Sequence, residues 1–293
     1  MNLAEIYLLA NDLDVLTGTL LSDFTVNQQY IGCSNQANSF IFPINVKAGY
    51  NFEPRLISIG RWGRHIVFRF STCTFVFKIA YKTSINILKR SASDTEPVFD
   101  ISDACVNMTF KSLATDYTLH LSFQDPLQCG LVAVYPTGEV PVEFSYLGMD
   151  IIDSSFNFDY LHSEILKELT SGKEQVVKSF IMDTNVIAWL DNEFASEALF
   201  IAGIHPHTKI SDLSEEDIHI LVSALQSVYA VAIEHIRNDC CDTFAISLED
   251  LYSIYGKVNE SCIGCSSKIK KSVIKGQATY WCPQCQKAKV KTR

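Results

Sequence analysis

Four cysteines near the end of the chain have the spacing of a metal site. Cys262 and Cys265 form one Cys-x-x-Cys pair, and Cys282 and Cys285 form a second pair sixteen residues later. Together they supply four thiolates within tetrahedral reach, which is the ligand set of a structural Zn²⁺. A disulfide framework is the alternative, and the paired spacing disfavours it in a chain without a secretion signal. Because the protein would fill all four coordination positions, this zinc would fold a module and would not activate water.

The stretch between the two cysteine pairs alternates between polar and apolar residues. This alternation predicts a β-hairpin with arms at 268–275 and 277–281. So short a segment cannot bury a core of its own. Metal binding must therefore supply much of its folding free energy.

The same segment is strongly basic. From Lys257 to the end the chain has nine Lys or Arg residues and one acidic residue, a balance of +8. The whole chain carries −9, so residues 1–256 carry −17. A basic hairpin on an acidic body predicts contact with phosphates, and the alternative is a solvated tail that keeps this end soluble. The candidate phosphate ligands are Lys268, Lys270, Lys271 and Lys275.

Length and composition predict a globular intracellular protein. A chain of 293 residues with 47% hydrophobic residues accommodates two domains and a small zinc module. It has no apolar run of 18 residues and no secretory signal, which predicts neither a membrane span nor export. Six further cysteines show no paired spacing. A reducing compartment, cytoplasm or nucleus, is expected.

The first half of the chain has the pattern of a β domain that follows one helix. A helical stripe of apolar residues runs through 3–21, and short β-type runs separated by turn residues follow from about 27 to 146. That texture predicts a β-sandwich or barrel with a flanking helix. The clearest strands are expected at 65–70, 74–79, 117–123 and 131–135.

The second half is predicted to be helical. Amphipathic or apolar segments are expected to form helices at 158–169, 176–182, 192–202 and from Ser214 to about His235. Ser214 is followed by three acidic residues, which is typical of a capped helix start. The predicted class is therefore α+β. Its domains are expected at 1–146 (β-sandwich with helix), 147–256 (helical) and 257–293 (zinc finger).

Two motifs in the second half resemble a known family. The run from Asn192 to Pro206 resembles the helix–two-turn–helix motif of the formamidopyrimidine-DNA glycosylase and endonuclease VIII family. The run from Thr279 to Lys287 resembles that family's C-terminal zinc finger, and 123–130 resembles a signature that precedes its interdomain linker. The resemblance implies base-excision repair of oxidised bases. In that reaction an N-terminal amine attacks the sugar, and the strand is cleaved through a Schiff base.

The residues that this chemistry uses are mostly missing here. The family begins with Pro-Glu after its initiator Met, whereas this chain reads Met1-Asn2-Leu3 and matches only at the later Glu5. A family lysine falls on Arg64, and arginine stays protonated, so it cannot replace an acid–base lysine. The resemblance therefore assigns no catalytic residue to this chain.

The binding residues are partly kept. The wedge Arg and Phe of the family fall on Leu127, Gln128 and Cys129, and its phosphate-gripping hairpin Arg falls on Gln277. Gln277 can still donate to a phosphate, more weakly than arginine. The resemblance also implies phosphate contacts at Asn192, where a plain helix cap is the alternative, and at Arg64, where an ordinary strand surface is the alternative.

Three functional hypotheses follow. The preferred one is a zinc-containing protein that binds double-stranded DNA, damaged or abasic duplexes included, mainly through phosphates and with little or no base excision. The second is a divergent but active glycosylase and AP lyase that uses the N-terminal amine, since an α-amino group has a pKa of about 8. The third is a protein-interaction module on the same fold, which the acidic body favours.

Overall fold

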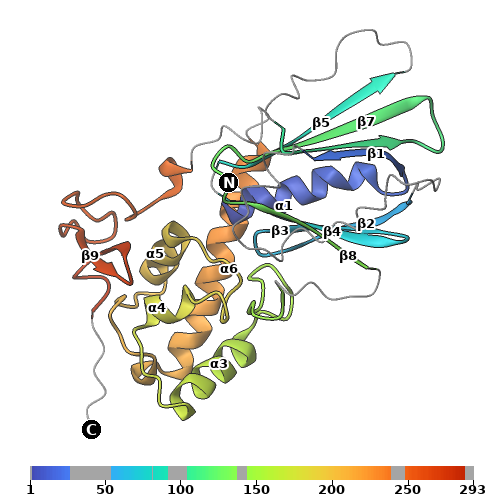
Figure 1. The fold of residues 1–293 in the computed structure, drawn as a ribbon. Helices are drawn as coiled ribbons and strands as arrows, with labels where there is room; N and C mark the ends of the chain where they lie inside the picture. The colour runs from blue at the N-terminus through green and yellow to red at the C-terminus, as the bar shows by residue number, and fades with distance from the viewer. Residues whose placement is uncertain are drawn as a thin grey trace. The chain divides into compact units, whose positions relative to one another are not determined.

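The computed structural model describes residues 2–26, 54–80, 82–91, 104–136, 144–238 and 248–287. The chain separates into two compact units whose main bodies are Glu5–Ser145 and Tyr146–Arg293 (Figure 1). The first unit is mostly β and the second mostly helical, which confirms the predicted α+β class. Cys33 and the segment 239–247, which contains Cys240 and Cys241, lie outside the described residues.

The first unit contains two four-stranded antiparallel sheets. The first has the order β1-β6-β7-β5 and the second β2-β3-β4-β8. Four of these strands, β3, β4, β7 and β8, correspond in that order to the strands that the sequence predicts at 65–70, 74–79, 117–123 and 131–135. The bounds are β1 Leu20–Val26, β2 Leu56–Trp62, β3 His65–Phe70, β4 Cys73–Lys78, β5 Ser84–Ser91, β6 Val106–Lys111, β7 Tyr117–Gln124 and β8 Leu131–Pro136.

One apolar core holds these sheets together with the N-terminal helix. Alternate residues of the strands point into it, and aromatic rings meet edge to face, as Phe68 and Phe77 do at 5.2 Å. Helix α1 (Leu3–Asp12) continues as a 3₁₀ turn to Leu16, and its apolar stripe joins the same core. The expected helical stripe through residue 21 is therefore too long. Gly18 has a φ of +88°, which ends the helical path before β1.

The second unit is a set of helices followed by a small hairpin. Three of the predicted helices match within two residues, and the fourth continues three residues beyond His235. The bounds are α3 Phe158–Thr170, α4 Val177–Ile181, α5 Asn192–Ile201, α6 Glu215–Asn238, the 3₁₀ turns η5 Ile210–Asp212 and η6 Glu249–Leu251, β9 Lys270–Ile274 and β10 Gln277–Trp281.

Helix ends in this unit are fixed by side chains. Asn157 caps α3 by accepting a hydrogen bond from the Tyr160 backbone at 3.0 Å. Ser214 and Asp217 form a reciprocal capping box at the start of α6, with each side chain bonded to the other's backbone N–H. Gly172, with a φ of +75°, follows α3 as the sequence predicts.

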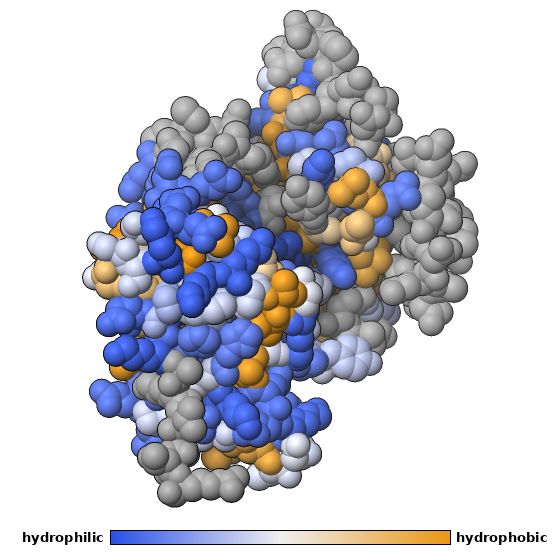
Figure 2. Space-filling view, turned by 90° about the vertical axis from the view of Figure 1, so that its left-hand side faces the viewer, coloured by the Kyte–Doolittle hydropathy of each residue, from blue (hydrophilic) through white to orange (hydrophobic). Residues whose placement is uncertain are grey.

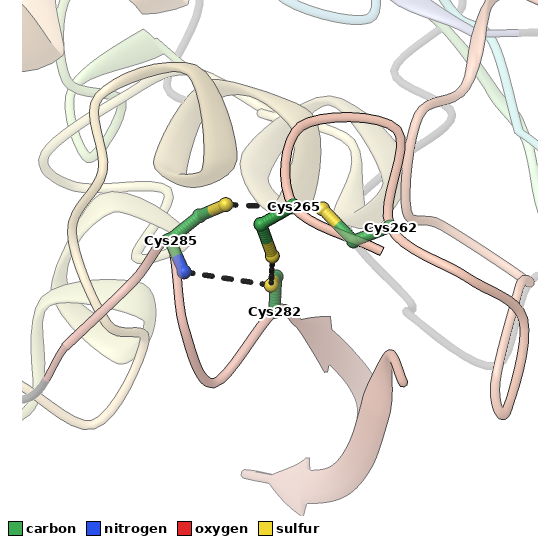
Figure 3. A group of neighbouring side chains, drawn as sticks. All are labelled: Cys262, Cys265, Cys282 and Cys285. Atoms are coloured by element: carbon green, nitrogen blue, oxygen red, sulfur yellow. Dashed lines mark hydrogen bonds between the residues drawn. The ribbon is translucent and has the colours of Figure 1, made fainter. Parts of the chain in front are cut away.

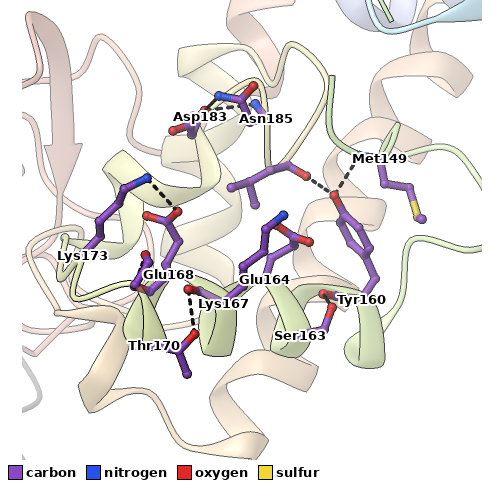
Figure 4. Close-up of polar contacts among 12 residues, drawn as sticks. Met149, Tyr160, Ser163, Glu164, Lys167, Glu168, Thr170, Lys173, Asp183 and Asn185 are labelled. Atoms are coloured by element: carbon purple, nitrogen blue, oxygen red, sulfur yellow. Dashed lines mark hydrogen bonds and ion pairs between the residues drawn. The ribbon is translucent and has the colours of Figure 1, made fainter. Parts of the chain in front are cut away.

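Residues 148–149 are anchored to the loop before α5 by Tyr160 (Figure 4). The Tyr160 hydroxyl accepts a hydrogen bond from the Met149 N–H at 2.9 Å and donates one to the Val186 carbonyl at 2.6 Å. Met149 also forms a parallel bridge with Ile187. A Cβ at Gly148 would lie 2.3 Å from the Val186 backbone, so only glycine allows this close approach.

One helix among the described residues, α6, is long and apolar enough by length and composition to cross a membrane. Its most apolar window has a mean hydropathy of 1.3, and 44% of that window is buried. The buried side chains pack within the second unit, where α6 contacts α3 and α5. This packing accounts for the apolar composition of α6.

Candidate metal centre and nucleic-acid interface

The four cysteines converge on one point (Figure 3). All four Sγ atoms lie within 4.8 Å of one another, and the Cys262–Cys285 and Cys265–Cys282 pairs are 3.8 and 3.3 Å apart. Tetrahedral Zn–S bonds place sulfur atoms about 3.8 Å apart. The cluster therefore fits the predicted structural zinc ion.

The thiols also need a cation on electrostatic grounds. Hydrogen bonds from Ser267 lower the pKa of the Cys265 thiol to about 6. The hydrogen bond with Cys265, followed by burial, raises the pKa of the Cys285 thiol to about 12. The raised pKa of Cys285 opposes ionisation of that thiol at neutral pH, and a bound cation would favour its thiolate form.

The hairpin between the cysteine pairs is formed by β9 and β10, as the alternation predicts. Lys275 and Gly276 make its two-residue turn, both with positive φ, which is the geometry of a type I′ turn. One face turns inward and buries Ile274 and Thr279. The other face includes Val273, which is 65% exposed.

The structure gives partners to three of the four predicted hairpin lysines. Lys268 donates to the Ser261 hydroxyl at 3.3 Å, and Lys275 donates to the Gln175 side chain at 3.1 Å. Lys271 lies over the ring of Tyr280, 5.5 Å from its centre. All three, like Lys270 and Gln277, remain exposed. The predicted basic surface is thus present on the hairpin, and its phosphate contacts remain a prediction.

Asn192 begins α5 and ties that helix to the hairpin. Its side-chain Nδ2 donates to the Ala278 carbonyl at 2.9 Å and to the Tyr255 hydroxyl at 3.3 Å. The preceding Asp191 makes no side-chain capping bond, and its carboxylate accepts a hydrogen bond from Tyr229 in the core at 3.4 Å. The amide of Asn192 is therefore a strut that fixes the hairpin beside the N-terminus of α5.

Two buried side chains that the sequence analysis did not identify make further links. The Glu197 carboxylate accepts backbone hydrogen bonds from Ser253, Ile254 and Tyr255 at 2.8–3.0 Å. Gln286 accepts from the Cys282 N–H and donates to the Ile204 carbonyl, both at 2.9 Å. Their partners lie far away in sequence, so no local motif reveals them. They lock the zinc segment onto α5.

Lys178 is a third residue that the sequence analysis missed. Its ammonium is buried at the start of α4, where it donates to the Asn192 carbonyl at 3.2 Å and to the Ser196 hydroxyl. Burial lowers the pKa of Lys178 to about 7, against the opposing attraction of Glu193 and Glu197. A single lysine inside the apolar run Val176–Met182 is the sequence signal that could have identified it.

Aromatic rings continue the connection from the helical core to the hairpin. Tyr252 and Tyr255 meet edge to face at 5.5 Å, and Tyr255 meets Tyr280 of β10 at 5.1 Å. His205 and His207, in the loop after α5, contact Trp281 at ring distances of 5.2 and 5.8 Å. Both histidines thus support the hairpin.

Two predicted positions lie in the first unit. Arg64 is half-buried in the turn between β2 and β3. The loop after β7 is held by the buried carboxylate of Asp125, which accepts from the backbone N–H groups of Cys129 and Gly130 at 3.2 and 2.7 Å. Leu127 is 48% exposed at its tip, next to Gln128 with a φ of +52°. The loop is therefore a defined turn that presents no cationic or aromatic side chain.

Comparison with known protein families identifies the helical part. Residues 147–241 match the model of the formamidopyrimidine-DNA glycosylase H2TH domain. This range contains α3 to α6, including Asn192, Glu197 and Lys178.

Individual relatives extend the match. A formamidopyrimidine-DNA glycosylase of Legionella pneumophila (strain Lens) is 31% identical over 176 residues, which cover 57% of this chain and 62% of that protein. One from Geotalea uraniireducens is 29% identical over 244 residues, or 79% of this chain and 82% of that protein. The chain thus spans less than two thirds of the first relative's length.

The fold of the whole chain also has a solved counterpart. MutM in complex with DNA that contains carbocyclic 8-oxo-G matches 98% of this chain with a TM-score of 0.73 and 17% sequence identity. At that identity the likeness establishes the fold. Together, these findings show that residues 147–241 match the H2TH domain of formamidopyrimidine-DNA glycosylases and that the whole chain has the fold of MutM.

Proposed function

We propose that this protein binds double-stranded DNA through its phosphates and performs little or no base excision. Its relatives are named as DNA glycosylases, and MutM, its counterpart of known structure, is bound to lesion-containing DNA. Damaged or abasic duplexes are accordingly the expected ligands. Zinc has a structural role in this account, because it holds the hairpin that contacts DNA.

The observation that carries this proposal is the strut between α5 and the hairpin. Asn192 fastens the positive end of a helix dipole to β10, whose partner strand β9 bears the exposed Lys270 and Lys271. A helix N-terminus and neighbouring ammonium groups are both sites that bind phosphate. In the proposed complex the backbone at the start of α5 contacts one phosphate. The hairpin, through Lys268, Lys270, Lys271, Lys275 and Gln277, contacts its neighbours.

The separation of acidic and basic residues within the second unit supports DNA contacts at the hairpin. Residues 146–256 hold five Lys or Arg residues against nineteen Asp or Glu residues, whereas 257–293 carry +8. An acidic body repels duplex DNA, so the basic hairpin defines where DNA can approach. Binding is therefore expected to depend on few phosphates.

Weak or absent catalysis is supported by residues of the first unit. Arg64 occupies the place of a family lysine and cannot exchange a proton near neutral pH. The loop at 127–129 offers Leu, Gln and Cys where the family places an Arg and a Phe that fill the gap left by a flipped base. Unstacking a base costs a few kcal/mol, and this loop has lost the groups that offset that cost.

The binding proposal is tested by fluorescence anisotropy on a labelled duplex between about 50 and about 200 mM salt. Log K is expected to fall with log salt, with a slope near −0.9 for each phosphate neutralised. Lys270→Ala and Lys271→Ala should each weaken binding and reduce the slope by about one. Lys167→Ala on α3, whose side chain is 73% exposed, is the matched control and should change neither. A salt-independent affinity contradicts the proposal.

A further inference from the structure

We propose that a pocket between α5, α6 and residues 251–253 docks a segment of a partner protein. The segment carries one large apolar side chain flanked by lysines or arginines. This inference goes beyond the proposed function, because it concerns a protein ligand and side chains that take no part in the phosphate contacts.

The pocket is small and mainly apolar. It has a volume of about 90 Å³ and lies between the helices, with Phe194 and Ile201 of α5, Val228 and Val231 of α6, and Tyr252 among its lining residues. Space of this kind accepts an apolar side chain and excludes a folded surface. A linear segment that inserts one anchor residue is therefore the fitting ligand.

Exposed apolar residues form the rim. Ile201 of α5 is 56% exposed and Val231 of α6 is 49% exposed. Figure 2 shows that hydrophilic residues dominate the visible surface, with hydrophobic residues in small separate patches. Two β-branched side chains beside an open apolar pocket leave surface that water solvates poorly, and a ligand would cover it.

The pocket is also rigid. Glu197 lies in its wall and holds three backbone N–H groups of residues 253–255. Phe194 is fixed by an edge-to-face contact with Tyr229 at 4.6 Å. A preformed pocket loses little conformational entropy when a ligand enters, which favours binding by one anchor residue.

The charge around the pocket selects a basic partner. Glu234 is exposed one helical turn beyond Val231, and Asp250 is exposed immediately before the lining residue Leu251. The Lys257 ammonium donates to the Tyr252 carbonyl, and Arg237 is an exposed cation three residues beyond Glu234. Acidic groups beside an apolar pocket attract basic flanking residues and repel nucleic acid.

The test uses the full-length zinc-loaded protein and a fluorescein-labelled heptapeptide with a central phenylalanine between two pairs of lysines. Anisotropy should show binding. Replacing the phenylalanine by alanine should weaken it about tenfold, because the anchor's burial is lost. Replacing the lysines by glutamates should abolish it. Val231→Gln and Ile201→Gln should each reduce affinity at least about fivefold. Leu166→Gln, at a 49% exposed position on α3, should leave it unchanged.

The charge component has its own variants. Glu234→Gln and Asp250→Asn should each lower affinity and reduce its salt dependence, whereas Glu260→Gln in the zinc segment should not. Equal effects of Leu166→Gln and Val231→Gln would overturn the proposal, as would no binding of the peptide.

Two other occupants of the pocket are distinguished from a partner segment, one by the peptide assay and one by sedimentation. If Phe244→Ser strengthens peptide binding, the chain's own segment 239–247 fills the pocket and the proposal is wrong. If sedimentation shows a dimer that Val231→Gln dissociates, a second copy is the occupant, which also overturns it. An unchanged affinity in Phe244→Ser and a monomer in sedimentation support a partner segment.

Discussion

The two units of this protein are held together in different ways. In the first unit, strands and one helix share an apolar core, and neighbouring strands supply most of its hydrogen bonds. In the second unit, buried polar side chains join segments far apart in sequence, as Glu197 does with residues 253–255 and Gln286 with Ile204. An apolar core tolerates many substitutions of similar volume, whereas a buried polar link fails when one partner is lost.

This difference bears on function. Two further polar links of the second unit, those of Lys178 and Asn192, lie at the start of α5, where phosphate binding is proposed. The positions in the first unit that depart from the family, Arg64 and the 127–129 loop, are surface features that the sheet core does not need. A chain can therefore change its chemistry there while the binding scaffold stays intact.

Loss of zinc should produce the largest effect and should affect the second unit alone. Cys282→Ser, or chelation, removes a metal whose binding supplies about 10 kcal/mol or more in structural sites. The hairpin should unfold and DNA affinity should be lost, while the strands of the first unit stay folded. Zinc content, DNA anisotropy and hydrogen exchange of both units measure this. Cys129→Ser, at an exposed cysteine of the first unit, should retain full zinc content.

Removal of one buried carboxylate should have the next largest effect. Glu197→Ala leaves three backbone N–H groups without their acceptor and should cost about 3–5 kcal/mol in the second unit. Urea unfolding measures this loss. Glu164→Ala, which removes a surface pair with Lys167 at 3.3 Å (Figure 4), should cost less than about 1 kcal/mol. A similar cost for both variants would show that the buried links do not distinguish this unit.

The buried lysine should give the second unit a pH dependence. The pKa of Lys178 is about 7 in the folded protein and 10.5 without burial, so the unfolded chain binds more protons between these values. Stability from this group should rise with pH from about 7 to about 10.5, by at most about 1.4 kcal/mol per unit. Below pH 7 the contribution of Lys178 to stability should not change with pH.

Lys178→Met should remove this rise, and Lys167→Met, at an exposed position, should retain it. Urea unfolding at pH 7 and pH 9 makes the comparison. Identical slopes for the wild type and Lys178→Met would show that Lys178 has an ordinary pKa in the folded state.

The smallest expected effect is a gain in DNA affinity. Gln277→Arg restores a cation at the exposed start of β10, next to the hairpin turn, and should strengthen duplex binding by a few-fold while steepening the salt slope by about one. Glu260→Arg also adds a positive charge, but outside the hairpin strands, and should strengthen duplex binding less than Gln277→Arg does. Equal gains from both would mean that net charge, and not hairpin geometry, sets affinity.

Local patterns predicted the elements and the metal centre well. The alternation of 268–281 predicted the hairpin, and the cysteine spacing predicted the zinc cluster, because both depend on neighbours in sequence. The first helix was predicted too long, since its apolar stripe continues into β1 while the left-handed turn at Gly18 interrupts it. Lys178, Glu197 and Gln286 were missed because each has a partner 14–82 residues away, as Lys178 has in Asn192 and Gln286 in Ile204. Only the folded chain brings these groups together.

The central claim is that this protein binds DNA without the covalent chemistry of the DNA glycosylases that it resembles. It is tested most directly by a paired measurement on one abasic-site duplex: affinity by anisotropy and covalent capture with borohydride, which traps only a Schiff base. The account predicts tight, salt-sensitive binding and no trapped adduct. A trapped adduct would contradict it and would identify an active lyase.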